Sequence, residues 1–169
     1  HVLLQALDRA DLPAGALNIV HGSGAVAGAA LTTHRDIAKI SFTGSTDTRR
    51  AILHAAAERM ARVTLELGGK GAQIILDDAD LDAAAAQALT SGFINSGQAC
   101  IAGTRILVPT NLKAAFQDRL IAALAHWPVG PASDPASRIG PMVSQRQWDR
   151  VQSYIRLGQA EGATLLAGG

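Results

Sequence analysis

The fold is decided by residues 38–67, which read AKISFTGSTDTRRAILHAAAERMARVTLEL. The apolar runs at 38–42 and 62–67 are typical of short strands, and helical signals lie between them. Ser45 or Thr46 can serve as the N-cap of that helix. The residues that we expect on its buried face are Ile52, Leu53, Ala56 and Met60. A strand, a helix and a second strand in this order predict a parallel βαβ unit.

The same alternation continues on both sides of this unit. Further strands are expected at 16–20, 72–76, 105–109 and 163–167, and helices at 2–10, 22–31, 77–93, 111–127 and 145–162. Helical spacing predicts core faces made of Leu81, Ala85, Ala88 and Gly92 in one helix and Leu112, Phe116, Leu120, Ala123 and Trp127 in another. Ser144 and Gln147 fit a capping box, and the proline-rich segment 128–143 indicates a surface loop. The fold class we predict is α/β with parallel, doubly wound sheets.

Composition excludes several classes of function. The 169 residues carry a net charge of +1 with scattered basic residues, which argues against a nucleic-acid partner. No apolar run reaches the length of a membrane helix, and the five histidines show no metal-ligand spacing, so we expect neither a membrane nor a metal. The one cysteine forms no internal disulfide, which fits a reducing, cytoplasmic compartment.

Both ends of the chain indicate an interior segment of a larger protein. The chain starts without methionine inside an expected helix, and it ends on an expected strand followed by two glycines. We therefore expect this chain to be the central part of a longer polypeptide.

Two glycine-containing turns are candidates for phosphate binding. The first is GSGAVAG at 22–28, where Gly24 and Gly28 come close to the dinucleotide fingerprint but with one residue too many. The second is Thr43-Gly44-Ser45, at the carboxyl end of a strand and the start of a helix, where free N–H groups attract anions. Either stretch can also be an ordinary strand-to-helix turn, and local sequence does not decide between these interpretations.

The one thiol, Cys100, lies in the segment INSGQACIAGTR at 94–105. A lone cysteine is most often an inert apolar residue of a core. However, the residues before Cys100 have no apolar period, and small neighbours leave room for a substrate beside the sulfur. A nucleophile in such a loop could direct its own backbone N–H at an oxyanion. The sequence thus makes Cys100 a candidate nucleophile.

The second candidate catalytic group is Glu66. Alternation in RVTLEL places Val63, Leu65 and Leu67 on one side of the strand and Glu66 on the other. A carboxylate at the carboxyl end of such a strand lies where open sheets bind ligands, and partial burial there would make it a usable general base. The alternative is a structural ion pair, for example with Lys70.

Three motifs, FTGST at 42–46, LELGGK at 65–70 and GQACIAGTR at 97–105, together resemble the aldehyde dehydrogenase superfamily. The resemblance runs from LPAGALNIV near the start to the final GATLLAGG. It implies a Rossmann-like cofactor domain whose C-terminal part is 1–67, followed by the N-terminal part of a catalytic domain at 68–169.

The resemblance also implies a reaction. Cys100 would attack an aldehyde, hydride would pass to NAD or NADP, and Glu66 would activate the water that hydrolyses the thioester to a carboxylic acid. The residues that would contact the cofactor are Gly24, Gly28, Thr43, Gly44, Ser45, Leu67 and Gly68. Ala99 and Ile101 would border the substrate tunnel.

Departures and gaps also follow from the resemblance. Arg49 stands where the family usually has glycine, and Gly71 where serine or asparagine is common. The family's oxyanion asparagine and ribose-binding lysine would precede His1. A ribose-binding glutamate and the strand that joins subunits would follow Gly169. We therefore expect a homo-oligomer, dimer or tetramer, of the complete protein and no activity from this segment alone.

Three alternatives remain open. A CoA-acylating relative would pass the acyl group to CoA, but such enzymes typically lack the glutamate. A catalytically silent binding or structural relative would have no need of both Cys100 and Glu66. A thiol hydrolase without cofactor would need a histidine partner such as His126 or His54, and neither lies in a motif.

Overall fold

The computed structural model describes residues 2–169 as two compact units, and His1 lies outside the described residues. The units are His1–Leu67 and Gly68–Gly169, so they divide at the position where the family resemblance sets its domain boundary. The roles of the two units as cofactor and catalytic domains stay predictions.

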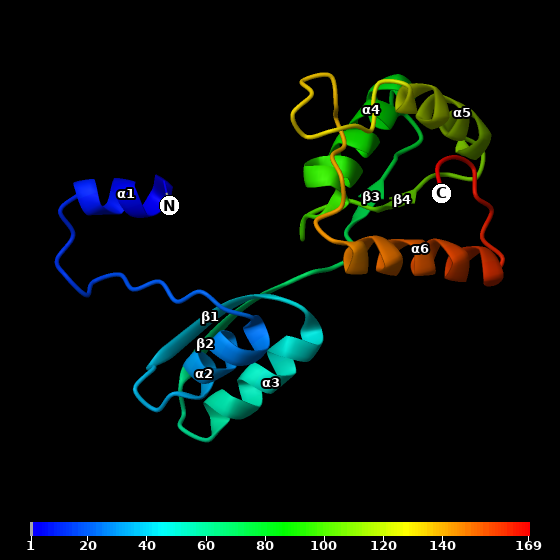
Figure 1. Ribbon diagram of the computed structural model, residues 1–169. Helices are drawn as coiled ribbons and strands as arrows, with labels where there is room; N and C mark the ends of the chain where they lie inside the picture. Colours follow the sequence, from blue (N-terminus) through cyan, green and yellow to red (C-terminus); the bar gives the residue numbers. More distant parts are fainter. Residues whose placement is uncertain (1) are drawn as a thin grey trace. The chain divides into compact units, whose positions relative to one another are not determined.

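The first unit is built on the predicted βαβ arrangement (Figure 1). Its strands β1 (Lys39–Gly44) and β2 (Arg62–Leu67) pair in parallel, and the helix α3 (Thr46–Ala57) connects them. Ser45 is the N-cap, since its Oγ accepts a hydrogen bond from the N–H of Thr48 at 3.3 Å. The other elements are α1 (Val2–Arg9), the π-helical turn η1 (Gly24–Gly28) and α2 (Ala29–Thr33).

The core of this unit lies between α3 and the strand pair. Ile40, Ile52 and Ala56 are buried, which confirms part of the predicted helical face. The prediction is wrong for Leu53, which is 42% exposed, and for Met60, which is 89% exposed. Met60 lies beyond the end of α3 with a left-handed φ of 56°, so it leaves the helical stripe that would have directed it inward.

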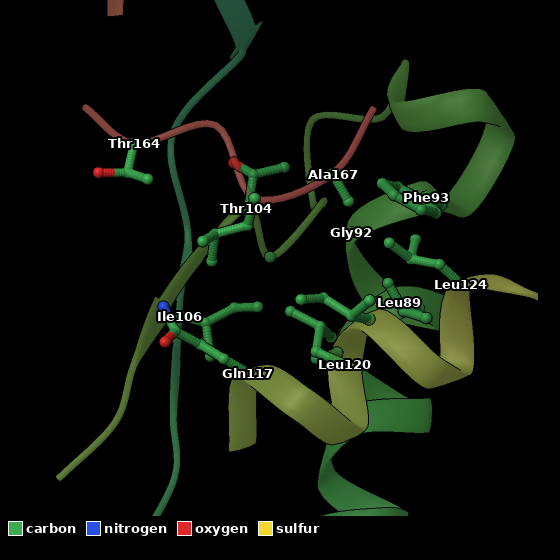
Figure 2. A pocket seen from close by; sticks show the side chains of 14 residues that line it. Leu89, Gly92, Phe93, Thr104, Ile106, Gln117, Leu120, Leu124, Thr164 and Ala167 are labelled. Carbon is green, nitrogen blue, oxygen red and sulfur yellow. The ribbon is translucent and has the colours of Figure 1, made fainter. Parts of the chain in front are cut away.

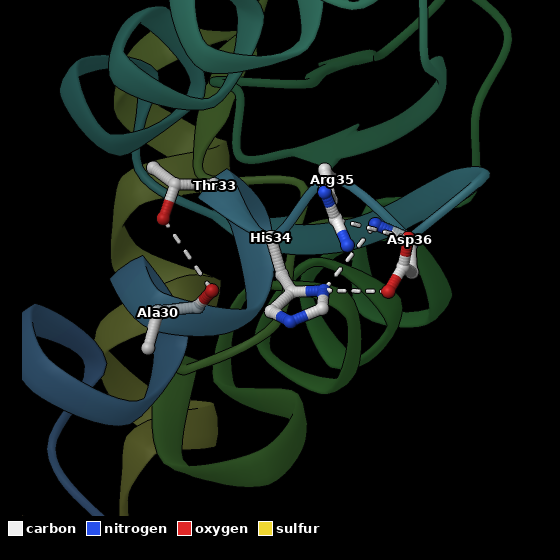
Figure 3. Close-up of polar contacts among 5 residues, drawn as sticks. All are labelled: Ala30, Thr33, His34, Arg35 and Asp36. Carbon is white, nitrogen blue, oxygen red and sulfur yellow. Dashed lines mark hydrogen bonds and ion pairs between the residues drawn. The ribbon is translucent and has the colours of Figure 1, made fainter.

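Polar contacts fasten α2 to its surroundings. Figure 3 shows the end of α2, where the Thr33 hydroxyl donates to the Ala30 carbonyl at 3.4 Å, and the turn that follows, where His34 Nδ1 accepts from the N–H of Asp36 at 3.3 Å. Arg59, just after α3, donates from Nη2 to the Thr32 carbonyl at 2.7 Å. The bond from Arg59 therefore ties α2 to the segment that follows α3, whereas the other two bonds are local.

The second unit repeats the parallel arrangement with two short strands, β3 (Ala72–Ile74) and β4 (Arg105–Leu107). Between them run α4 (Leu81–Phe93) and the 3-10 turn η2 (Ile94–Gly97), and α5 (Lys113–Leu124) and α6 (Gln145–Ala160) follow β4. Asp80 caps α4, and the Ser144 hydroxyl caps α6 by accepting from the third helical N–H.

The core of the second unit is formed where α4 packs on α5. Ala85, Ala88 and Phe116 are buried there, and Ile75, Leu81, Ala84, Ile106, Val108 and Leu120 pack around them. Small residues on α4 therefore let α5 approach closely, as the sequence predicted. Trp127 is only half-buried, with its ring packed edge-on against Phe93 at a centroid distance of 5.5 Å.

Two predicted strands are wrong. Residues 16–20 and 163–167 form no strand, although both are apolar runs. Leu17, Val20 and Leu166 are 52%, 62% and 52% exposed. A strand exists only when a neighbouring backbone accepts and donates its hydrogen bonds, and among the described residues neither run has such a partner.

The α/β class with parallel strands is confirmed. Within residues 2–169, none of the helices is both long and apolar enough to cross a bilayer. The described residues also contain no group of three or more metal-ligating side chains.

Candidate active site

The candidate nucleophile lies open in the second unit. Cys100 is exposed and makes no disulfide, so the core interpretation of this cysteine is wrong. Ala99 beside it is half-buried, and Ile101 is 76% exposed. Within residues 2–169 the backbone N–H of Cys100 donates to no acceptor, which leaves it available to an incoming oxyanion.

A left-handed turn leads into the thiol. Asn95, Ser96 and Gly97 have φ values of 50°, 56° and 75°. This conformation suits glycine but costs about 1–2 kcal/mol for an ordinary residue. The carboxamide of Asn95 supports the turn by donating to the Gln98 carbonyl at 3.4 Å. The backbone is therefore strained in the residues just before Cys100, and such strain is common at functional sites.

The segment after the thiol is fastened by hydrogen bonds to other elements. The N–H of Gly103 donates to the carbonyl and to the hydroxyl of Ser91, both at 3.3 Å. The carbonyl of Gly103 accepts from Gln73 Nε2 at 2.5 Å, and the same nitrogen donates to the Ala88 carbonyl at 3.2 Å. Gly103 is itself buried, so both its polar backbone groups are satisfied away from solvent.

The segment before the thiol has its own anchor. The hydroxyl of Ser96 accepts a hydrogen bond from the N–H of Gly140 at 3.0 Å. Gly140 belongs to the proline-rich surface segment, 44 residues further along the chain. The sequence alone did not indicate that Gln73, Ser91, Ser96 or Gly140 supports the thiol loop, because no local pattern predicts a contact across such separations.

The hollow in Figure 2 lies beside this loop and does not hold the thiol. Its volume is about 330 Å³, and it is lined mainly by apolar side chains of α4, α5 and the C-terminal segment, together with Gly103 and Thr104. Ala99, Cys100 and Ile101 are not among its lining residues. We therefore assign it no part in binding a substrate.

In the first unit, strand register brings several candidate residues to one edge. In the parallel ladder Thr43 is opposite Glu66, and Gly44 is opposite Leu67. Since Ser45 follows β1 directly, all of these residues lie at the carboxyl ends of the two strands. This is the edge at which open α/β sheets bind ligands.

The start of α3 at this edge can bind an anion. Among residues 2–169 the N–H groups of Thr46 and Asp47 donate to no acceptor, and they lie at the positive end of a 12-residue helix. Arg49 stands on the first turns of the same helix, and its buried Nε has no hydrogen-bond partner in the described part of the chain. Unpaired N–H donors and a guanidinium group suit a bound diphosphate, although the negative charge of the Asp47 carboxylate would repel that anion.

The first glycine motif forms the π-helical turn η1. The N–H groups of Val26, Ala27 and Gly28 all point to the carbonyl of Ser23, at 3.1, 2.9 and 3.5 Å. Gly24 and Gly28 have open space where a Cβ would stand, so a ligand could approach the backbone closely at both residues.

Glu66 differs from expectation in one respect. The predicted alternation is confirmed, with Val63, Leu65 and Leu67 half-buried and Glu66 facing the other way. Yet the side of β2 that bears Glu66 is exposed, so the expected partial burial is wrong for the described residues. Among residues 2–67, Glu66 takes part in no ion pair. Gly68, the first residue of the second unit, is likewise exposed.

Comparison with known proteins identifies the family to which a chain with these features belongs. The model of the aldehyde dehydrogenase family matches residues 1–169. Aldehyde dehydrogenase family 2 member C4 of Arabidopsis thaliana is 46% identical over 161 residues, which are 95% of this chain and 32% of the relative.

Solved structures agree with the sequence match. An NAD+ complex of an aldehyde dehydrogenase from Bacillus cereus superposes with a TM-score of 0.93 at 42% identity, over 98% of this chain and 34% of that one. A variant of aldehyde dehydrogenase C from Pseudomonas syringae, complexed with NAD+ and octanal, gives a TM-score of 0.95 at 39% identity, over 99% and 35%. The chain thus spans about a third of the length of these relatives. This chain belongs to the aldehyde dehydrogenase family.

Proposed function

We propose that the protein containing this chain oxidises an aldehyde to a carboxylic acid with NAD+ or NADP+. The observation that carries the proposal is the exposed Cys100 thiol, in a fastened loop, with its own N–H unpaired among the described residues. Family membership supports the reaction class, and the NAD+ complexes of relatives support NAD+ as the cofactor.

Cys100 is the nucleophile in this proposal. Its thiol first loses a proton to solvent; the sulfur then adds to the aldehyde carbon, and the carbonyl oxygen becomes an oxyanion that the N–H of Cys100 stabilises. Loss of hydride from the resulting thiohemiacetal leaves a thioester on the sulfur. The exposed side chain of Ile101 and the small side chain of Ala99 favour an apolar aldehyde, in line with the octanal bound to one relative.

Glu66 is the deacylation base in this proposal, and its role rests on its place in the LELGGK motif. A carboxylate removes a proton from water, and the hydroxide equivalent attacks the thioester carbon to release the acid and the thiol. The exposed position of Glu66 at the carboxyl end of β2 leaves its oxygens free for this task.

The first unit contributes to cofactor binding in this proposal. When bound, the nicotinamide would accept the hydride. The unpaired N–H groups at the start of α3, with Gly44 and Ser45, would hold the diphosphate, and Arg49 would add positive charge. Thr43 and Leu67 lie at the same sheet edge and would contact the cofactor with Gly24, Gly28 and Gly68.

A CoA-acylating activity is the second candidate within the family, and the presence of Glu66 disfavours it. We further propose that the complete protein is a homo-oligomer and that its substrate partner is a small aldehyde. Because the chain spans about a third of its relatives' length, we expect no turnover from these 169 residues alone.

Kinetics on the complete protein test the proposal. Cys100→Ala should abolish NAD(P)+-linked aldehyde oxidation. Glu66→Gln should preserve a first burst of NADH and then stall, because acylation survives and deacylation does not. Turnover that survives both substitutions would refute the assignment, and release of an acyl-CoA in place of the acid would establish the second candidate.

A further inference from the structure

We infer that Gln73 is a positioning residue for Cys100. Its carboxamide holds together the helix that enters the nucleophile loop and the segment that leaves it, and so fixes where the thiol stands. The inference rests on the proposed function for its catalytic consequence, but the placement of the loop can be measured without any aldehyde.

The hydrogen bonds of Gln73 span the loop. Nε2 donates to the carbonyl of Gly103, three residues after the thiol, at 2.5 Å and to the carbonyl of Ala88, in the last turns of α4, at 3.2 Å. One side chain from β3 therefore ties both ends of the segment that carries Cys100. The two bonds join residues 15 and 30 positions apart, so they constrain the tertiary arrangement and not a local turn.

Packing around Gly103 shows that the contact is close. A Cβ at residue 103 would lie 2.7 Å from Gln73 Cγ and 2.7 Å from Ser91 Oγ. Glycine is thus needed for the side chain of Gln73 to reach the backbone. Gln73 is part-buried, and its partner across the ladder is Ile106, so the strand pair sets its direction.

The chemistry of the carboxamide makes the role specific. Both acceptors are carbonyl oxygens, and the amide nitrogen of Gln73 carries two N–H groups, one for each. A methionine would match the length of the side chain and donate nothing. A glutamate would direct a carboxylate at two carbonyl oxygens when ionised, yet could donate one hydrogen bond when protonated.

The test uses the complete protein with Gln73→Met and Gln73→Glu, and the same changes at Gln87 as controls, since Gln87 is exposed on α4 next to Ala88. Hydrogen exchange of the amides of Gln98, Ala102 and Gly103, which are the hydrogen-bonded amides of the loop among the described residues, reports its order. Steady-state kinetics at several pH values report its catalytic effect. Urea unfolding shows which variants are folded.

In Gln73→Met we expect the amides of Gln98, Ala102 and Gly103 to exchange about tenfold faster than in the parent. We expect kcat to fall roughly ten- to a hundredfold, with the cofactor KM within about twofold. The kcat of Gln73→Glu should recover toward the parent as pH falls and its carboxyl gains a proton, whereas that of Gln73→Met should not. The Gln87 variants should match the parent in all three measurements.

Unchanged exchange at Gln98, Ala102 and Gly103 in folded Gln73→Met, or a kcat within about twofold of the parent, would overturn the inference. If Gln73→Met does not fold, the pH series of Gln73→Glu decides, and the absence of any recovery at low pH would count against it. Activity that persists in Cys100→Ala would instead refute the proposed function and leave the exchange result valid as a statement about the loop.

Discussion

Replacing Gly103 with alanine would test how tightly the exit of the nucleophile loop is packed. The new Cβ would lie 2.7 Å from Gln73 Cγ and Ser91 Oγ and 3.0 Å from Gln73 Cδ. Non-bonded carbon atoms normally stay about 3.5–4.0 Å apart, so the neighbours must move. Gly103 has no positive φ, and the steric contact alone therefore decides the effect.

The loss of unfolding free energy in Gly103→Ala can be estimated from the side chains that the new methyl group displaces. Overpacking of this kind costs about 1–3 kcal/mol. Gln73 cannot withdraw without weakening its two hydrogen bonds, and each such bond contributes about 0.5–1.5 kcal/mol. We therefore expect Gly103→Ala to lower the free energy of unfolding by about 2–4 kcal/mol.

For a control glycine in α6, the same substitution should change the free energy of unfolding in the opposite direction. Gly158 lies inside α6, and a Cβ there would meet only Ala163 Cβ at 4.0 Å, an ordinary contact. Gly158→Ala should stabilise the protein by about 0.5–1 kcal/mol, because alanine loses less backbone entropy in a helix. Urea unfolding followed by tryptophan fluorescence measures both variants, since Trp127 and Trp148 lie in the same unit as both glycines. Equal stability of Gly103→Ala and the parent would refute the reasoning, as would a destabilised Gly158→Ala.

Two further comparisons test the cap of α3 and the core of the second unit. Ser45 and Ser144 each accept from the third N–H of their helix at 3.3 Å, so alanine at either should lower the free energy of unfolding by about 0.5–2 kcal/mol, but only Ser45→Ala should also raise the KM for the cofactor. Equal cofactor KM values for the two variants, by initial-rate kinetics, would remove Ser45 from the diphosphate site. Phe116 is 2% exposed, and Phe116→Ala should cost about 3–5 kcal/mol by urea unfolding, whereas Ile121→Ala, at a side chain 42% exposed on the same helix, should cost under about 2 kcal/mol. Similar losses from the two would contradict the position of the core.

The βαβ unit of residues 38–67 was predictable because its signals agree at every level. Alternation fixed the faces of β2, the Ser45 hydroxyl caps α3, and Ile52 and Ala56 reach the core as their spacing predicts. The end of α3 was not predictable in the same way. Helical spacing continues through Met60, but the chain turns left-handed there and the period stops.

The strands expected at 16–20 and 163–167 show what an apolar run cannot establish. A β-branched residue such as Val20 favours an extended, half-buried backbone. A strand also needs a neighbouring backbone, and composition says nothing of where that neighbour lies. Pairing is therefore a property of the tertiary arrangement, and prediction from one segment stops short of it.

The candidate site likewise has features that local sequence predicts and features that depend on tertiary contacts. The exposure of Cys100 followed from the small and aperiodic residues around it, which is local information. The groups that fasten its loop did not follow, because Gln73, Ser91 and Ser96 reach their partners across 30, 12 and 44 residues. Their donors and acceptors are ordinary side chains until the fold brings them to Gly103 and to the segment before the thiol.

The covalent role of Cys100 is the central claim, and mass spectrometry of the digested protein tests it most directly. The complete protein carrying Glu66→Gln is mixed with an aldehyde and NAD+, quenched in acid and digested with a protease. The account predicts an acyl group on the peptide that contains Cys100, in a yield that matches the NADH of the first turnover. NADH formed in full while Cys100 stays unmodified, or an acyl group on a different residue, would contradict it.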